Sequence, residues 1–264
     1  MLKNAVNSKV SVSIIVPSYN EETHLEACVR EVSAAIRHRV GSFEFIIVND
    51  CSQDKTGEIA DRLAATIPDV RVVHNEINRG LGWNYRKGVE LAKNEYVIMV
   101  PGDNEINPES IGQLLEFAGA ADMIIPYPEN MFYRPWIRQV ISVTFNCILN
   151  WISGFKLGYY NGSLLARREQ LLQTKSRTNG FAFQAETLVQ MLFLGCSYQQ
   201  VPFKLNYSSG RMTAFRLKNV IAVVSTVIRM TLHYKIFARS KYAHIKPPTG
   251  DYLINPGKRS ALRG

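Results

Sequence analysis

Short apolar runs alternate with longer amphipathic stretches over the first 130 residues of the chain. The apolar runs at residues 10–16, 43–48, 70–74 and 96–100 are rich in β-branched side chains, as buried strands are. Between them, residues 23–37, 56–65 and 83–92 carry apolar residues at helical spacing. Strands that alternate with helices over short links predict right-handed βαβ units. We therefore expect an α/β fold with a mostly parallel central sheet flanked by helices.

Two long apolar segments follow, at residues 136–155 and 219–238, interrupted by Arg138 and Arg229. They are either amphipathic helices packed on the sheet or helices that lie in a membrane interface. For the second segment we favour the membrane surface because basic residues follow it, whereas for the first both interpretations stay open. The N-terminus lacks the apolar core of a signal peptide, and no window of about 18 apolar residues predicts a full membrane span. Residues 241–264 are expected to form a basic, irregular tail.

Charge divides the chain at about the same place. Residues 1–130 hold 12 Lys and Arg and 19 Asp and Glu, a net charge of −7, whereas residues 131–264 hold 19 basic and 3 acidic residues, a net charge of +16. An acidic first half argues against a nucleic-acid-binding protein, and the basic second half predicts an anionic partner. The four cysteines are scattered, without zinc-site spacing, which argues against a disulfide framework or a structural zinc and is typical of a reducing compartment.

Polar segments follow three of the predicted strands, at residues 17–22, 49–56 and 101–107. In open α/β sheets, ligands bind at the carboxyl ends of the strands. The third segment places Asp103, Glu105 and Asn107 at alternate positions. In extended backbone these side chains would share one side and offer hard oxygen ligands to Mg²⁺ or Mn²⁺. The alternative is a solvated turn that supplies the N-cap of a helix beginning near Pro108.

The other two strand ends offer groups for a nucleotide. Asp50, at the end of the second strand, could accept hydrogen bonds from a base or a ribose, and Tyr19 could stack on a base. Glycines at residues 80 and 82, before a helix, would allow the backbone to approach a ligand closely. This loop matches neither the phosphate-binding loop of kinases nor the dinucleotide fingerprint of dehydrogenases, so both of those classes lose support.

Four segments in this order, VSIIVPSYNEE, EFIIVNDCSQDKT, NRGLGWNYRKGVELA and YVIMVPGDNEINPE, resemble family 2 glycosyltransferases with the GT-A fold. The resemblance covers residues 10–125. It implies a UDP- or GDP-linked sugar donor and a metal-dependent, inverting transfer. The residues implied to hold the nucleotide are Pro17, Tyr19, Glu21 and Asp50, and those implied to form the metal motif are Asp103 and Glu105, with Asn107 in the third position. Arg79, Arg86 or Lys87 would assist at the diphosphate.

Motifs of the second half resemble the polyprenyl-phosphate sugar transferases within that family. They are RQVIS from residue 138, NGFAFQAE from residue 179, VPFK from residue 201 and GRMT from residue 210. Three motifs differ from that group. The D-x-D-x-Q motif reads D-x-E-x-N, the D-x-x-S-G-F segment reads YYNGS without its acidic residue, and the R-x-x-G segment reads YSSG without its arginine.

A polyprenyl phosphate is already an anion, so it needs no general base. It needs cations for its phosphate and an apolar path for its lipid. We expect Arg138 to be the main cation, with further candidates at Arg134, Lys204, Arg211 and Arg216. The alternative is a saccharide or lipid hydroxyl acceptor with Glu186 as the base. A third possibility is a catalytically inactive membrane-surface binding module.

These expectations combine into one catalytic domain, residues 1–240. Its donor half, residues 10–130, would bind the nucleotide sugar and the metal. Its acceptor half, residues 131–240, would carry the membrane-interface helices. We expect a protein that is peripheral to the cytoplasmic face of a membrane, that binds no nucleic acid and that could form a homo-oligomer.

Overall fold

The computed structural model describes residues 7–104, 106–129, 136–180, 182–203 and 217–237. These residues form a seven-stranded sheet with the order β3-β2-β1-β4-β6-β5-β7. Only β6 runs antiparallel to its two neighbours, so the prediction of a mostly parallel sheet is confirmed. The strands are β1 (Asn7–Ser18), β2 (Val40–Asn49), β3 (Val70–His74), β4 (Tyr96–Met99), β5 (Met123–Pro128), β6 (Leu165–Arg167) and β7 (Tyr198–Phe203).

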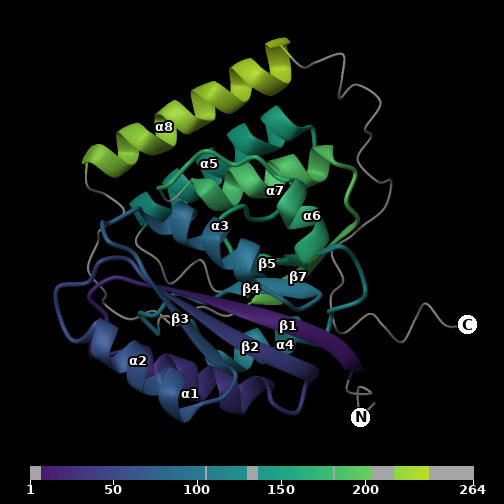
Figure 1. Ribbon diagram of the computed structural model, residues 1–264. Coiled ribbons are helices and arrows are strands. Elements are labelled where there is room, and N and C mark those ends of the chain that lie inside the picture. Colours follow the sequence, from purple (N-terminus) through teal and green to yellow (C-terminus); the bar gives the residue numbers. More distant parts are fainter. Residues whose placement is uncertain (1–6, 105, 130–135, 181, 204–216, 238–264) are drawn as a thin grey trace, which may run out of the picture.

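Helices cover both faces of this sheet (Figure 1). One face packs against α1 (Leu25–Ile36), α2 (Thr56–Thr66) and α4 (Pro108–Leu115). The opposite face packs against a thicker layer, which consists of α3 (Leu81–Leu91), α5 (Trp136–Ser153), α6 (Arg168–Gln173), α7 (Phe183–Phe193) and α8 (Leu217–Thr231). Neighbouring residues of β1 show the alternation: Ile14 belongs to the first core, Ile15 to the second, and both are fully buried.

The first strand runs further than its sequence predicts. The predicted run covers residues 10–16, but Pro17 and Ser18 still pair with Val48 and Asn49 of β2. The Pro17 carbonyl points toward the β4 side, where it accepts a hydrogen bond from the Gly102 N–H at 3.2 Å. The proline nitrogen faces the same side, and β4 has already ended at Met99, so the missing N–H removes no hydrogen bond of the sheet.

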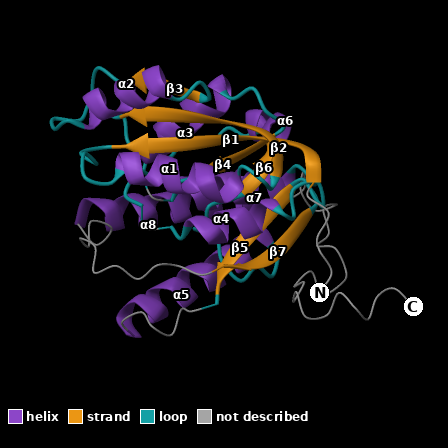
Figure 2. Ribbon diagram, turned by 90° about the horizontal axis from the view of Figure 1, so that it is seen from below, coloured by secondary structure: helices purple, strands orange, loops and turns teal. Residues whose placement is uncertain are grey.

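The strand order creates a crevice between β1 and β4. From β1 the chain steps outward to β2 and β3, and α3 then returns it to β4 on the other side of β1. At such a reversal the loops after the two central strands diverge toward opposite faces and leave room for a ligand. Figure 2 shows β1 and β2 ending side by side at this edge of the sheet. The three polar segments predicted from the sequence follow β1, β2 and β4 here.

The two long apolar segments are helices, as predicted. The first forms α5, and the second forms α8, which continues as a π-helical turn, η3 (Leu232–Phe237). Both lie on the outside of the thicker layer, next to each other and over α7 (Figure 1). None of the helices in the described part of the chain is long and apolar enough to cross a membrane.

Candidate active site

Backbone and side-chain hydrogen bonds tie together the loops that follow β1 and β2. The Asn20 N–H donates to Ser52 Oγ at 3.0 Å, and the Gln53 N–H donates back to Asn20 Oδ1 at 2.8 Å. The Glu21 N–H donates to Thr56 Oγ1 at 2.7 Å, at the start of α2. Glu21, one of the predicted nucleotide ligands, is therefore fixed through its backbone at the edge of the crevice.

Positive backbone φ angles mark the same three loops. Asn20 has φ 57°, Cys51 has φ 61° and Asn104 has φ 55°. Within the described residues, no other non-glycine residue has a positive φ. Such conformations are uncommon for side chains with a Cβ atom and concentrate at functional sites. Asn20 and Cys51 lie two residues beyond the ends of β1 and β2, and Asn104 lies in the loop that follows β4, so the strain is located where a ligand is expected.

Asp50 is buried, with 3% of its surface exposed, and its carboxylate organises the loop before α3. Its Oδ1 accepts from the Arg79 N–H at 2.7 Å and from Asn75 Nδ2 at 2.7 Å, and its Oδ2 accepts from the Gly80 N–H at 2.9 Å. Gly80 adopts φ 85°, which favours glycine. Direct contact between Asp50 and a nucleotide stays a prediction. The structure shows that Asp50 also shapes the loop beside it.

The other predicted nucleotide ligands differ in exposure. Tyr19 is 48% exposed at the end of β1, where its ring is accessible for stacking. The Arg79 guanidinium lies 5.6 Å from the centre of the Trp83 ring, at the start of α3. Lys87, further along α3, pairs with Glu90 of the same helix at 3.7 Å. Of the two basic residues, Arg79 is thus the one at the strand ends.

The segment after β4 differs from its expected geometry. Residues 102 and 103 form a turn and Asn104 has a positive φ, so this backbone is not extended. Asn107 caps α4, since its Oδ1 accepts the Glu109 N–H at 2.9 Å. The argument that an extended chain aligns residues 103, 105 and 107 is therefore wrong, and the predicted cap near Pro108 is confirmed. Glu105 lies outside the described residues.

Asp103 sits in this turn next to the end of β1. No group of three or more His, Cys, Asp and Glu side chains that could hold a metal ion occurs in the described residues. Mg²⁺, however, is commonly bound by one or two carboxylates together with the phosphates of a substrate. The carboxylate of Asp103, on a turn beside a crevice, fits that donor set. Its assignment as a metal ligand stays a prediction.

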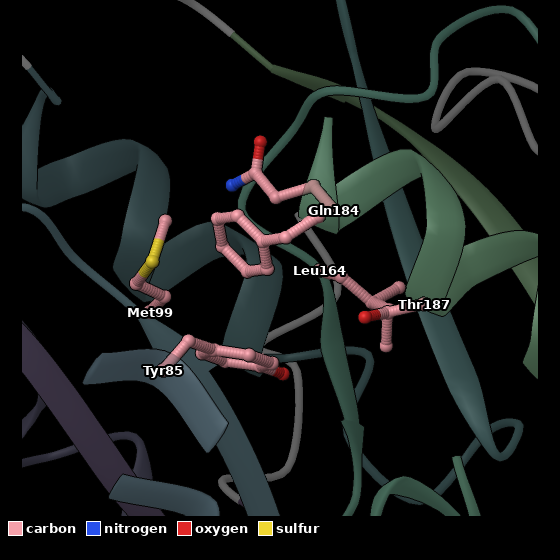
Figure 3. Close-up of a pocket in the computed structure, with 6 residues that line it drawn as sticks. Tyr85, Met99, Leu164, Gln184 and Thr187 are labelled. Atoms are coloured by element: carbon pink, nitrogen blue, oxygen red, sulfur yellow. The ribbon is translucent and has the colours of Figure 1, made fainter. Parts of the chain in front are cut away.

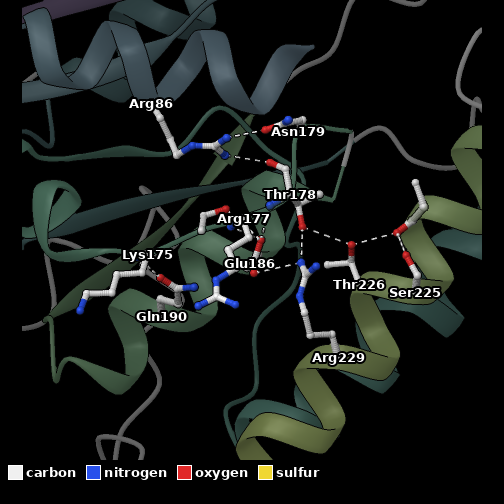
Figure 4. Close-up of polar contacts among 12 residues, drawn as sticks. Arg86, Lys175, Arg177, Thr178, Asn179, Glu186, Gln190, Ser225, Thr226 and Arg229 are labelled. Atoms are coloured by element: carbon white, nitrogen blue, oxygen red, sulfur yellow. Dashed lines mark hydrogen bonds and ion pairs between the residues drawn. The ribbon is translucent and has the colours of Figure 1, made fainter. Parts of the chain in front are cut away.

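Glu186, the candidate base, is buried on α7 with 5% of its surface exposed (Figure 4). Its Oε2 accepts hydrogen bonds from Ser176 Oγ and from the N–H groups of Arg177 and Thr178, at 2.9, 3.1 and 3.0 Å, and its Oε1 pairs with Arg229 of α8 at 3.1 Å. Burial alone would raise the pKa of Glu186, but these donors outweigh it and hold the pKa below 4.5. A carboxylate so occupied favours an anchoring role over proton abstraction.

The segment that Glu186 anchors was not recognised from the sequence. Residues 178 and 179 also bind α3: Arg86 Nη1 donates to the Thr178 carbonyl at 2.9 Å, and Arg86 Nη2 bonds Asn179 Oδ1. Arg86 is therefore engaged in this contact, and its role at the diphosphate stays a prediction. The sequence feature that could have revealed this segment is Arg229, a single arginine in an apolar helical stretch. Such a residue needs a partner when its helix packs against the protein.

A small pocket opens next to the carboxyl end of β4 (Figure 3). Its walls come from Tyr85 of α3, Met99 of β4, Leu164, and Phe183, Gln184 and Thr187 of α7. The rings of Tyr85 and Phe183 lie 5.2 Å apart between their centres. The lining is mostly apolar, and Gln184 and Thr187 add polar groups.

The predicted acceptor cations lie mainly outside the described residues. Arg138 belongs to the first turn of α5, but the placement of its side chain is not described. The remaining candidates lie entirely outside the described residues: Arg134, Lys204, Arg211 and Arg216. Their roles stay predictions.

Comparison with known proteins places this chain in a family. The family model "Glycosyl transferase family 2" matches residues 13–167. The polyprenol monophosphomannose synthase of Mycolicibacterium smegmatis is 30% identical over 202 residues, which cover 72% of this chain and 75% of that protein. The putative glycosyltransferase EpsH of Bacillus subtilis is 34% identical over 116 residues, 44% of this chain, and the match spans only 33% of EpsH.

The fold has solved counterparts as well. A crystal structure of glucosyl-3-phosphoglycerate synthase from Mycobacterium tuberculosis, in complex with Mn²⁺, UDP-glucose and phosphoglyceric acid, superimposes with a TM-score of 0.65. Its identity to this chain is 18%, with 88% of this chain and 81% of that chain covered, so the likeness concerns the fold. The matched family model, the relatives and the seven-stranded sheet agree: the chain belongs to glycosyltransferase family 2 and has the GT-A fold.

Proposed function

We propose that this glycosyltransferase moves a sugar from a nucleotide diphosphosugar to a polyprenyl phosphate at a membrane surface. The observation that carries the proposal is the outer surface of α5, α8 and η3, which we call the apolar face. It unites large, exposed apolar side chains on a molecule whose donor loops are built from polar residues. The likeness to a polyprenol monophosphomannose synthase supports the same acceptor class.

The apolar face contains most of the exposed large apolar side chains of the described residues. Its members on α5 are Trp136, Ile137, Val140, Ile141, Val143, Ile148 and Trp151, and those on α8 and η3 are Ile221, Val224, Ile228, Leu232 and Ile236. Neither segment contains an Asp or a Glu, and the Lys235 ammonium lies 5.3 Å from the centre of the Trp151 ring. Apolar, aromatic and basic residues without carboxylates suit an interface rich in anionic lipid.

The donor would bind in the crevice between β1 and β4. Tyr19 would stack on the base, and the loop organised by Asp50 would contact the nucleoside. A divalent cation, Mg²⁺ or Mn²⁺, held by Asp103 together with Glu105, would neutralise charge on the departing diphosphate. Arg79, at the start of α3, would add positive charge on the same side.

The acceptor side needs no proton transfer. An oxygen of the polyprenyl phosphate, ionised at neutral pH, would form the new bond to the anomeric carbon while the bond to the nucleoside diphosphate breaks, with inversion at that carbon. The occupied state of Glu186 is consistent with this chemistry, because a phosphate nucleophile leaves no role for a base. Arg138, with Arg134, Lys204, Arg211 and Arg216 as further candidates, would hold the acceptor phosphate.

Product extraction tests this function. Purified protein would be incubated with Mn²⁺ and radiolabelled UDP- and GDP-sugars, with and without polyprenyl phosphate. We expect label in the organic phase only with the polyprenyl phosphate. Arg138→Ala should lower acceptor-dependent transfer at least about ten-fold while donor hydrolysis changes little. Label that moves only to saccharide hydroxyls would refute the proposed acceptor.

A further inference from the structure

Helix α8 has two chemically different faces. Ile221, Val224 and Ile228 point outward and are each more than half exposed. On the opposite side, Thr226 and Met230 are buried, with 3% and 2% of their surfaces exposed. The outward side of α8 is therefore apolar, whereas its inner side combines the apolar Met230 with the hydroxyl of Thr226.

The inner face of α8 meets residue Thr178. Arg229 Nη2 donates to Thr178 Oγ1 at 2.6 Å, and the hydroxyls of Thr226 and Thr178 lie 3.2 Å apart (Figure 4). Thr178 is itself buried, with 7% of its surface exposed. Its N–H is bound by Glu186 of α7 and its carbonyl by Arg86 of α3. One residue thus joins α8, α7 and α3.

The contact continues through the start of α3 into the loop before that helix. The Gly82 N–H donates to the Asn179 carbonyl at 2.8 Å. A Cβ at Gly82 would lie 2.2 Å from the Thr178 carbonyl oxygen, so the two segments touch without a gap. Two residues earlier, the Gly80 N–H binds Asp50 in the crevice. Hydrogen bonds and two short backbone stretches, residues 178–179 and 80–82, therefore connect α8 to the loop before α3.

We propose that Thr226 and Arg229 are positioning residues that couple the docking of α8 on a membrane to the shape of the loop before α3, which contacts the nucleotide in the proposed function. The inference rests on the membrane part of the proposed function. A bilayer that takes up the outward side chains of α8 fixes the rotation of the helix. In that rotation Thr226 and Arg229 face Thr178 and hold residues 178 and 179 against α3. Docking therefore favours the loop conformation in which Gly80 and Asp50 are joined.

Linkage makes the coupling measurable without turnover. If docking tightens nucleotide binding by some factor, nucleotide must tighten docking by the same factor. We would measure the Kd for UDP and for GDP, each with Mn²⁺, in the presence and absence of phosphatidylcholine–phosphatidylglycerol vesicles. Vesicle co-sedimentation with and without the nucleotide supplies the reciprocal value. For the wild-type protein we expect both factors to be about five or more.

Matched variants assign the coupling to the inner face. Thr226→Val and Arg229→Met should reduce both factors below about two while vesicle binding in the absence of nucleotide persists. Ser225→Ala is the control for the first, since the Ser225 hydroxyl bonds only the Ala222 carbonyl of its own helix, and Arg229→Lys should restore part of the coupling. A wild-type protein that binds vesicles with unchanged nucleotide affinity would overturn this inference alone. A wild-type protein that does not bind vesicles would overturn both the inference and the membrane part of the proposed function.

Discussion

Two buried carboxylates, Asp50 and Glu186, are each surrounded by hydrogen-bond donors of the chain itself. For Asp50 we predict that Asp50→Asn destabilises the protein by about 1–3 kcal/mol, because a single amide oxygen cannot accept from Arg79, Gly80 and Asn75 together. Nucleotide affinity should fall as the loop before α3 loosens. Chemical denaturation and nucleotide titration measure the two effects.

Asp61→Asn is the control for Asp50→Asn, since Asp61 is an exposed carboxylate that pairs with His74 on the surface. It should change stability by less than about 0.5 kcal/mol. Equal effects of the two substitutions would show that the buried hydrogen bonds of Asp50 are not what organises the loop.

For Glu186 the prediction concerns pH. Its pKa is lower in the folded protein than the ordinary 4.5, so its contribution to stability is complete above about pH 4.5 and is lost as the pH falls through the folded pKa. Glu186→Gln should therefore flatten the loss of stability on acidification, as measured by denaturation at several pH values. Glu169→Gln, an exposed carboxylate on α6, should leave the wild-type profile unchanged.

Turnover of the Glu186→Gln variant separates the two acceptor chemistries. A phosphate acceptor needs no base, so we expect kcat to stay within about a few-fold of the wild-type value. Complete loss of kcat in a folded variant would instead support a hydroxyl acceptor with Glu186 as the base.

Asp103→Ala should abolish metal-dependent nucleotide binding, because it removes the carboxylate that we propose as a metal ligand. We expect a thermal shift with UDP or GDP that depends on Mn²⁺ in the wild-type protein and is absent in the variant. Asn107→Ala is the control for Asp103→Ala. Asn107 caps α4, so its loss should cost about 1 kcal/mol of stability and leave nucleotide binding in place.

At this scale the sequence predicted which residues lie near the carboxyl ends of the central strands, but not which groups of the chain bind them. Pro17, Asp50 and Asp103 were expected at one edge because the carboxyl ends of parallel strands meet there. The pairing of Glu186 with Arg229 joins residues 43 positions apart, and no local pattern encodes such a distance. The positive φ of Asn104 likewise turned a segment that periodicity described as extended.

At the scale of elements, the contact between α3 and residues 178–179 depends on a missing side chain. Gly82→Ala would gain about 1 kcal/mol in helix propensity, but its Cβ would meet the Thr178 carbonyl oxygen at 2.2 Å and Phe183 Cβ at 2.8 Å. We expect a net loss of stability of about 1–3 kcal/mol, together with weaker nucleotide binding. Gly180→Ala is the control, since the nearest atom to its Cβ would be Ala222 Cβ at 3.9 Å.

The elements themselves were largely predictable. Apolar runs and helical spacing located the first four strands and first three helices, because both faces of this sheet are buried and each element had to match its period. The strands β5, β6 and β7 and the helices α6 and α7 were not predicted, and β6 has only three residues. The direction of β6, antiparallel to β4 and β5, depends on its neighbours in the sheet and not on its own residues.

At the scale of the whole molecule, contacts of Thr178 with α8, α7 and α3 connect the apolar face to the side of the sheet where the β1–β4 crevice lies. The net charge of −7 in residues 1–130 accompanies the site proposed for a cation and a diphosphate, and the net charge of +16 beyond it accompanies the apolar face, whose helices carry no carboxylates. A membrane contact of this kind has an apolar part, which salt does not screen, and an electrostatic part, which it does.

Substitution of the outward residues of α8 separates these two parts. A variant with Ile221→Ser, Val224→Ser and Ile228→Ser should bind anionic vesicles at least about ten-fold more weakly, since each half-exposed side chain would forfeit about 1 kcal/mol of burial in lipid. Leu172→Ser, which removes a comparably exposed side chain from α6, should bind as the wild-type protein does. Vesicle co-sedimentation at low and high salt measures both. Because the three side chains point away from Thr178, nucleotide affinity without vesicles should not change. A fall in that affinity would show that α8 supports the loop before α3 even when α8 is not docked on a membrane.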